Sequence, residues 1–338
     1  QLSSGLARAA TVAVVSGNVW KLGDIIYSTP VFVGAPQDRY DLLYSDTTYV
    51  SFYTKYLNRR GVVYQGANDG MLHAFNAGRY YESSNDISRG TLNAMGTYAL
   101  GEEIWGIIPH NLLPHLQWLN KPYYDGCHVY YVDNKVKVFD AKVFSSSTLH
   151  PNGWGTMLVQ TMRLGGMPYT LSDGTTVLSS PLMAIDITDP VNPSAMWEFT
   201  HSTLGLTTVY PSVVKTGEEW YLITGSGPTN LVGYSDQSAR AFVINIDDGS
   251  LEETFNFGTY AHCGDPTVVD YNMDYDSDLI YMGYCSNYSI STYKWLGGGV
   301  KRINTFNEED PDDWSQSTLI NLGRPVVSSG AVTLDPSG

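Results

Sequence analysis

The chain is poor in charged residues, and basic residues are the scarcer kind. Asp, Glu, Lys and Arg together make 16% of its 338 residues, and 19 basic against 34 acidic residues give a formal net charge of -15. A surface that binds nucleic acid through its phosphates needs clustered Lys and Arg, and the chain shows no such cluster. The same deficit disfavours simple adsorption to anionic lipid. We therefore expect no nucleic-acid partner.

Long apolar runs are also missing. No run approaches the ~20 residues that a membrane helix requires. The first residues lack the basic and apolar regions of a signal peptide, so a signal for export would lie upstream of Gln1 or would have been removed. We expect no membrane span.

Cysteine is scarce, with Cys127, Cys263 and Cys285 as the three examples. Three thiols cannot all pair within one chain. Cys263 and Cys285 lie on either side of an acidic loop, and a bridge between them would join the two strands that carry it. We favour that pair, with Cys127 free or paired outside this segment. The count alone leaves a wholly reduced chain open.

Aromatic residues and glycine are plentiful, with 25 Tyr and 33 Gly. Such charge-poor chains are usually rich in β-structure and usually secreted. Short strand-like runs recur between turn clusters, at a spacing that suits a sandwich, a barrel or a propeller. The runs lie at residues 29–34, 61–67, 128–133, 156–162, 180–187, 212–217, 219–227, 239–246, 267–270 and 279–284.

Several of these runs share a loose repeat in which a strand ends at Gly or Asp-Gly, as in NDGMLHAFNAG, GEEWYLITGSG and RAFVINIDDGS. Each can be one corner of a repeated blade. Residues 111–119 are the best candidate for a short helix, although Pro114 interrupts it. Residues 80–96 are predicted to form a surface loop. We expect an all-β fold, and the length allows a single domain over residues 1–338.

One acidic run carries the strongest chemical signal. Oxygen-bearing side chains occupy alternate positions of a nine-residue stretch between two apolar runs. Four carboxylates this close repel one another unless they spread, take up protons or bind a cation. Oxygen donors without His or thiolate favour calcium over zinc or copper. The candidate ligands are Asp270, Asn272, Asp274, Asp276 and Asp278.

The run is not an EF-hand loop. Its sixth position is Tyr275, where that loop needs Gly, and its twelfth is Tyr281, where that loop needs Glu. The β-branched and aromatic flanks place it between two strands. The alternative interpretation is a solvated acidic turn, because Asp and Asn tolerate turn geometry.

A second polar group surrounds His73. A histidine near the carboxylate of Asp69 could suggest acid–base catalysis. No nucleophile can be placed by spacing, so we expect a structural role. Asn68, Asp69 and Gly70 would form a turn, and His73 would hydrogen-bond within one blade.

Taken together, the chain resembles the C-terminal domain of the PilY family of type IV pilus tip adhesins and biogenesis factors. The GANDGMLHAF run and the acidic loop are the most specific parts of the resemblance. The matching stretches follow the family's order and cover most of the chain, at residues 22–34, 62–78, 100–119, 128–133, 154–166, 181–199 and 266–284.

The resemblance implies a modified, quinoprotein-like β-propeller with one calcium site in a loop between two strands. By position, the ligands would be the side chains of Asp270, Asn272, Asp274 and Asp278 with an oxygen of Asp276. It also implies a non-enzymatic role in pilus biogenesis, the balance of extension and retraction, and surface attachment. The implied partners are minor pilins and the pilus tip, with a host or abiotic surface bound by regions outside this segment. The implied location is extracellular, at the pilus tip.

The chain departs from the family's pattern in places. Gly283-Tyr284 stands where members commonly have Gly-Asp, which puts the local strand pairing in question. Family members also continue with further strands after residues 325–338 and often carry an N-terminal von Willebrand factor A-like region. We therefore expect a segment of a longer polypeptide.

Two other classes of function stay open from the residues alone. Trp-bearing, Gly-turned repeats also occur in quinoprotein dehydrogenases, whose calcium is bound jointly by protein and quinone. Against this enzyme, the acidic residues here form one contiguous loop. A structural filament or surface-layer component would also be acidic, β-rich and stabilised by calcium.

Overall fold

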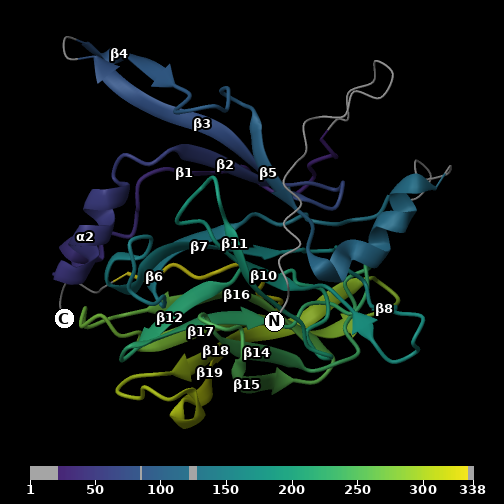
Figure 1. Ribbon diagram of the computed structural model, residues 1–338. Coiled ribbons are helices and arrows are strands. Elements are labelled where there is room, and N and C mark those ends of the chain that lie inside the picture. The colour runs from purple at the N-terminus through teal and green to yellow at the C-terminus, as the bar shows by residue number, and fades with distance from the viewer. Residues whose placement is uncertain (1–21, 84–85, 122–127, 334–338) are drawn as a thin grey trace. The chain divides into compact units, whose positions relative to one another are not determined.

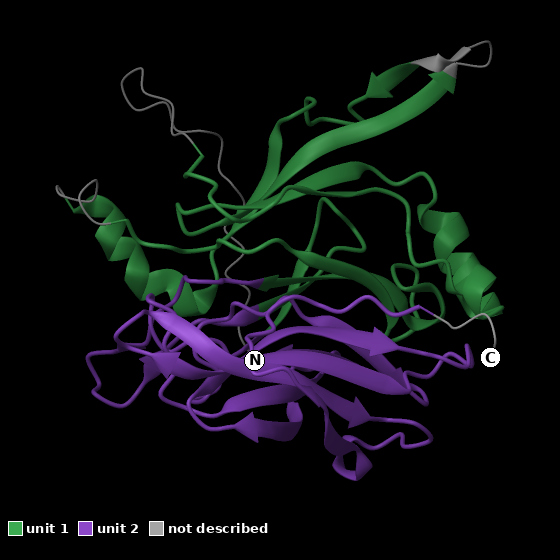
Figure 2. Cartoon of the chain, turned by 180° about the vertical axis from the view of Figure 1, so that it is seen from behind, with its two compact units in different colours: residues 1–160, 183–197 green, residues 161–182, 198–338 purple. Residues whose placement is uncertain are grey.

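The computed structural model describes residues 22–83, 86–121 and 128–333. The chain divides into two compact units (Figure 2). Unit 1 comprises residues 1–160 and 183–197, and unit 2 comprises residues 161–182 and 198–338. The prediction of one domain over residues 1–338 stays a prediction.

Unit 1 contains two sheets. The first has the order β1-β2-β3-β4, with β5 paired to β3, and the second has the order β11-β10-β7-β6, whose strands reach at most two residues beyond the unit. The strands are labelled in Figure 1. Their bounds are β1 (Val31–Val33), β2 (Gly61–Gly66), β3 (Leu72–Ser83), β4 (Asp86–Asn93), β5 (Glu103–Ile107), β6 (Lys137–Lys142), β7 (Trp154–Thr161), β10 (Leu182–Asp186) and β11 (Ser194–Phe199).

Unit 2 contains two four-stranded antiparallel sheets in which each strand pairs with the next along the chain, β12 to β15 and β16 to β19. A short ribbon, β8-β9, belongs to the same unit. The bounds are β8 (Tyr169–Thr170), β9 (Val177–Leu178), β12 (Ser212–Thr216), β13 (Glu219–Gly225), β14 (Ala239–Asn245), β15 (Leu251–Gly258), β16 (Ala261–Val269), β17 (Leu279–Ser289), β18 (Lys294–Asn304) and β19 (Ser315–Asn321).

Burial explains why the apolar runs form strands. Every residue of β7 and of β10 is buried, as expected for strands covered on both faces. In unit 2, side chains from seven strands, β12 to β18, meet in one apolar cluster that includes Val214, Ile223, Val243, Ile280 and Ile303. Burying such side chains is the main favourable contribution to folding.

The sequence did not lead us to expect the helices α1 (Tyr40–Leu43) and α2 (Thr47–Tyr56). Asp46 caps α2, because its carboxylate accepts the backbone N–H groups of Thr48 at 2.8 Å and Tyr49 at 3.3 Å. β-branched and aromatic residues favour strands by propensity, and here the buried face of the helix overrides that preference.

The short helix that we expected at residues 111–119 is present as η1 (His110–Asn120), a 3₁₀-helix that contains Pro114. Two further 3₁₀ turns are η3 (Pro151–Gly153) and η4 (Pro311–Asp313). No helix in the described part of the chain is long and apolar enough to cross a membrane.

Two local predictions are wrong. Residues 80–96 do not form a loop, because most of them belong to the hairpin of β3 and β4. Residues 128–133 do not form a strand. There, the backbone N–H of Tyr131 donates to the side chain of Asn68 at 2.9 Å instead of joining a sheet.

Despite the departure from the family's pattern, the pairing of Gly283 with β18 is regular, whereas the register of the β16–β17 ladder shifts opposite Gly283, between Cys263 and Pro266. Gly283 lies opposite Val300 and Tyr284 lies opposite Gly299 in the β17–β18 ladder. Tyr284 therefore does not disrupt the pairing of these two strands.

Candidate functional site

The acidic run at residues 270–278 connects β16 to β17, as predicted. These strands form an antiparallel hairpin whose ladder begins beside the loop with Val269 opposite Leu279. The hairpin fixes both ends of the run.

Asp270 organises the first half of the loop. Its Oδ1 accepts the backbone N–H of Met273 at 2.6 Å, and its Oδ2 accepts that of Tyr275 at 3.1 Å. Met273 and Tyr275 have φ values of 61° and 86°, in the left-handed region that side-chain-bearing residues seldom adopt. The carboxylate thus holds two strained residues in a tight coil.

Asn272 and Asp274 continue the pattern. The Oδ1 of Asn272 accepts the N–H of Asp274 at 3.2 Å, and the Oδ1 of Asp274 accepts the N–H of Asp276 at 3.0 Å. The amide of Asn272 also donates to Asp274 at 2.7 Å. These are the contacts of an Asx-rich turn.

Asp278 closes the loop and is only 2% exposed. Its Oδ2 accepts the N–H of Tyr271 at 2.7 Å. Burial raises the pKa of Asp278, backbone hydrogen bonds oppose that rise, and the negative charges of Asp270 and Asp274 add to it. The loop therefore concentrates negative charge around a buried carboxyl group.

One cation offsets part of this charge. Lys215 of β12 forms an ion pair with Asp276 at 2.9 Å, and its ammonium lies 4.3 Å from the centre of the Tyr275 ring. Among the described residues, no other carboxylate of the run has an ion-pair partner. The backbone N–H of Ser277 also donates to the carbonyl oxygen of Lys215 at 2.7 Å, and the N–H of Lys215 donates to the hydroxyl of Ser277 at 3.1 Å, which ties the loop to β12. Lys215 could not be predicted as a partner of the run, because it lies 55 residues before it.

The donor set suits a hard cation, since every candidate side chain offers oxygen. Their present arrangement does not form a metal cluster. Within the described ranges, no group of three or more His, Cys, Asp or Glu side chains is placed to hold a metal ion. The carboxylates face the loop's own backbone amides instead. The calcium site at Asp270, Asn272, Asp274, Asp276 and Asp278 stays a prediction.

The predicted bridge between Cys263 and Cys285 is wrong, because both are free, buried thiols. Cys263 lies opposite Tyr284 and Cys285 lies opposite His262. Directly opposed residues share one face of a sheet and successive residues alternate, so the two thiols lie on opposite faces. Burial raises the pKa of Cys263 to about 12 and that of Cys285 to about 11. Cys127 lies outside the described residues.

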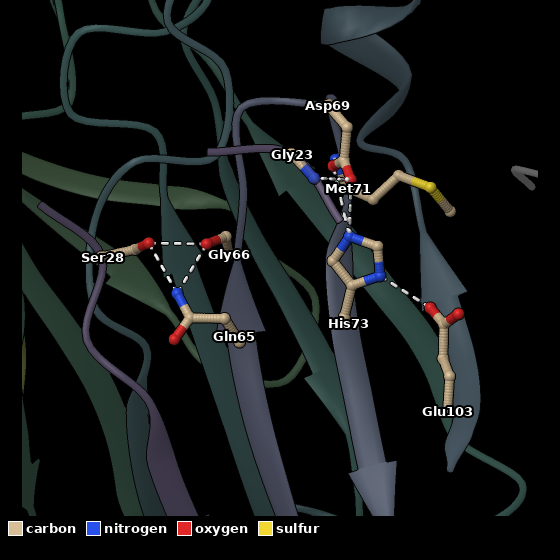
Figure 3. A network of polar contacts seen from close by, with 8 residues as sticks. All are labelled: Gly23, Ser28, Gln65, Gly66, Asp69, Met71, His73 and Glu103. Atoms are coloured by element: carbon tan, nitrogen blue, oxygen red, sulfur yellow. Dashed lines mark hydrogen bonds and ion pairs between the residues drawn. The ribbon is translucent and has the colours of Figure 1, made fainter. Parts of the chain in front are cut away.

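The second polar group lies in unit 1, at the turn from β2 to β3 (Figure 3). Asp69 accepts the backbone N–H groups of Gly23 at 2.9 Å and Met71 at 3.1 Å. The Nε2 of His73 lies 3.1 Å from Asp69, and its Nδ1 lies 2.6 Å from Glu103 of β5. The structure therefore confirms the expected turn and the hydrogen-bonded histidine.

Glu103 was not foreseen, and together with Asp69 it keeps the ring of His73 charged. Burial by itself would lower the pKa of His73, but hydrogen bonds to Asp69 and Glu103 outweigh burial and raise that pKa to about 9. Hydrogen bonding to His73 lowers the pKa of Asp69 against its own burial. An imidazolium with both nitrogens engaged has none left to accept a proton. The hydrogen bonds of Asp69, His73 and Glu103 thus connect Gly23, β3 and β5.

Antiparallel four-stranded sheets that follow one another along the chain are the blades of β-propellers, so the fold places the protein in that class. A family model described as the PilY1 beta-propeller domain matches residues 22–334. The chain belongs to the PilY1 β-propeller family. The predicted fold class and the predicted family are thereby confirmed.

Two relatives with PilY1 names support this family assignment. The chain is 30% identical over 241 residues to a type IV pilus biogenesis factor PilY1 homolog of Xylella fastidiosa, which covers 68% of this chain and 16% of the relative. It is 28% identical over 322 residues to the type IV pilus biogenesis factor PilY1 of Pseudomonas aeruginosa strain PAO1, covering 91% of this chain and 24% of the relative. These relatives are named as biogenesis factors, not as enzymes, which is consistent with a non-enzymatic chain.

A solved structure shares the fold. The crystal structure of the Pseudomonas aeruginosa PilY1 C-terminal domain superposes with a TM-score of 0.61 at 21% identity, over 90% of this chain and 57% of that one. The chain spans less than a quarter of the length of these curated relatives.

Proposed function

We propose that this chain is the pilus-associated, calcium-binding propeller domain of a type IV pilus biogenesis factor, and that its acidic loop is the calcium site. The observation that carries the calcium proposal is the buried carboxyl of Asp278, which faces the charges of Asp270 and Asp274. Lys215 neutralises Asp276 alone. Like charges held this close favour a bound cation.

The ligands would be Asp270, Asn272, Asp274 and Asp278 with an oxygen of Asp276. Calcium would supply the positive charge that the loop lacks. The chain's own part is to hold the loop ends in the β16–β17 ladder and to anchor Ser277 to β12. Asp270 and Asp274 would exchange contacts with backbone amides for contacts with the ion. A partner that touches the ordered loop would then bind with an affinity that depends on calcium.

The family membership supports the cellular part of the proposal. We infer an extracellular location at the pilus tip and an association with minor pilins, in support of pilus extension, retraction and attachment. Contact with a host or abiotic surface would use regions outside this segment.

Thermal unfolding tests the calcium site. The chain is melted with calcium, with magnesium and with a chelator. Calcium at about 100 times its dissociation constant stabilises the folded state by about 2.7 kcal/mol, which corresponds to a rise in Tm of a few degrees. We expect this rise for calcium and a smaller one for magnesium, which dehydrates reluctantly.

The matched variants are Asp274→Ala and Asp173→Ala. Asp173 caps an exposed turn by accepting the N–H groups of Thr175 and Thr176, so it reproduces the Asx-turn chemistry outside the loop. Asp274→Ala should abolish the calcium response and Asp173→Ala should keep it. Identical melting in all three conditions would reduce the loop to an acidic turn.

A further inference from the structure

Unit 1 contains a cavity of about 180 Å³ that no part of the proposed function uses. It lies between β1 and β6, each an edge strand of its sheet, and the apolar side chains of Val31, Val33, Val138 and Phe139 line it. Arg59, which follows α2, is also on its wall. The wall therefore combines an apolar part with a cationic group.

Arg59 is half-buried and has one buried donor group without a partner. Its Nε donates to the carbonyl oxygen of Gly34, and its Nη1 donates to the hydroxyl of Thr156 at 2.8 Å. Its Nη2 is buried and has no hydrogen-bond partner in the described part of the chain. The centre of the Tyr56 ring lies 5.7 Å from the guanidinium carbon, and this cation–π contact only weakly replaces the missing hydrogen bond. An unpaired buried donor is unfavourable, and a ligand oxygen would relieve it.

Two carboxyl groups border the same space. Asp140 accepts the hydroxyls of Thr156 and Tyr49, each at 2.6 Å, and Asp38 accepts the backbone N–H of Asp140 at 2.6 Å. Burial and the charge of Asp140 raise the pKa of Asp38 to about 6. A ligand anion would face these carboxyls, and a ligand cation would face Arg59. The charges on the wall therefore select a neutral ligand.

Volume limits the size of the ligand. A water molecule occupies about 30 Å³ in the liquid, so the cavity has room for a group several times the size of a water molecule. We propose that this cavity is a binding site for a small neutral group with a branched apolar body and one carbonyl oxygen, and that the oxygen accepts a hydrogen bond from Arg59.

Such a group can be a free small molecule or a valine residue with its peptide carbonyl, because both offer the same chemistry. Phe32 on the cavity wall is 63% exposed, so the site is not sealed from solvent. The inference does not rest on the calcium loop, which belongs to unit 2.

The test is a calorimetric and NMR titration of the whole chain with isobutyramide, isobutyrate and isobutylammonium. The NMR probe is the Nε–H resonance of the Arg59 side chain. We expect isobutyramide to saturate with a millimolar Kd and to shift that resonance, and each charged analogue to bind at least tenfold more weakly. A parallel titration with N-acetylvalinamide separates the sources, since tighter binding than isobutyramide indicates a peptide and weaker binding a free molecule.

Two variants locate the site. Arg59→Met removes the donor and keeps an apolar stem, and Val138→Phe fills the space while leaving Arg59 in place. Both should weaken isobutyramide binding at least tenfold. The control is Arg60→Met, because Arg60 also has a buried unpaired nitrogen but does not line the cavity. Unchanged binding in Val138→Phe, equal loss in Arg60→Met, stronger binding of isobutyrate, or no saturable binding would each overturn the proposal.

Discussion

At the scale of single residues, the carboxylates of Asp69 and Glu103 keep His73 protonated at pH values where a solvent-exposed histidine would lose its proton. A free histidine loses its proton near pH 6.5, whereas the two carboxylates beside His73 raise its pKa to about 9. The ring is therefore charged throughout the ordinary pH range. Because its charge is favoured in the folded state, its titration must affect stability.

The direction in which stability changes with pH follows from the raised pKa of His73. A pKa that is higher in the folded state contributes stability that is complete below pH 6.5 and is lost as the pH rises through about 9. The loss should be on the order of 3 kcal/mol for this buried group. We expect the difference in Tm between the wild type and His73→Gln to shrink between pH 6.5 and pH 9.5. A difference that stays constant across this range would show that His73 is not charged in the folded state.

At the scale of elements, residues 322–330 form an extended segment that crosses β18, β17 and β16 on their backbones. Leu322 donates its N–H to Gly298 at 3.1 Å, and Asp265 donates its N–H to Val327 at 2.9 Å. A Cβ added at Gly283 would lie 2.5 Å from the carbonyl oxygen of Val326. Glycine is needed at this position because the backbones approach so closely.

We therefore expect Gly283→Ala to displace this segment. The amide hydrogen of Asp265 should exchange with solvent at least tenfold faster than in the wild type, as measured by NMR. Gly330→Ala is the control, because a Cβ there would meet its nearest neighbour, the hydroxyl of Thr267, at an ordinary 3.8 Å. Equal exchange rates in Gly283→Ala and the wild type would mean that the contact is not needed to hold the segment.

The sequence could predict some of the strands and helices but not all of them. Apolar runs bounded by turn residues located β2, β7, β10, β12, β13, β14, β17 and the end of β16, because burial on a sheet needs only a local pattern. They did not locate β15, β18 or β19. The pattern failed at α2, where the buried Tyr49, Phe52 and Tyr56 have helical spacing but their residue types favour strands. Asp46 before that spacing was a usable capping signal.

Some residues of the two polar groups could be predicted from the sequence, and others could not. Alternating oxygen side chains marked the acidic loop, and an Asp-Gly turn marked the group at His73. Lys215 and Glu103 could not be found from the sequence. Glu103 reaches His73 through the pairing of β5 with β3, and Lys215 reaches Asp276 from β12, a strand of a different sheet. The bridge between Cys263 and Cys285 failed for the same reason, because register decides which face each thiol occupies.

At the scale of the whole molecule, the net charge of -15 means that any salt stabilises the chain by screening. A test of calcium must separate this general effect from specific binding. Excess charge of one sign destabilises a compact chain through self-repulsion, and salt screens that repulsion. Raising NaCl from about 10 mM to about 150 mM shortens the screening length from about 30 Å to about 8 Å. The wild type and Asp274→Ala should therefore gain stability from NaCl to nearly the same extent.

Calcium should act differently, because a bound ion stabilises through its site and not through the average charge. At 150 mM NaCl we expect micromolar to millimolar calcium to raise the Tm of the wild type and to leave that of Asp274→Ala unchanged. Differential scanning calorimetry of both chains measures this directly. If calcium raised both midpoints equally, its effect would be screening of the -15 charge, and the acidic loop would have no specific ion to hold.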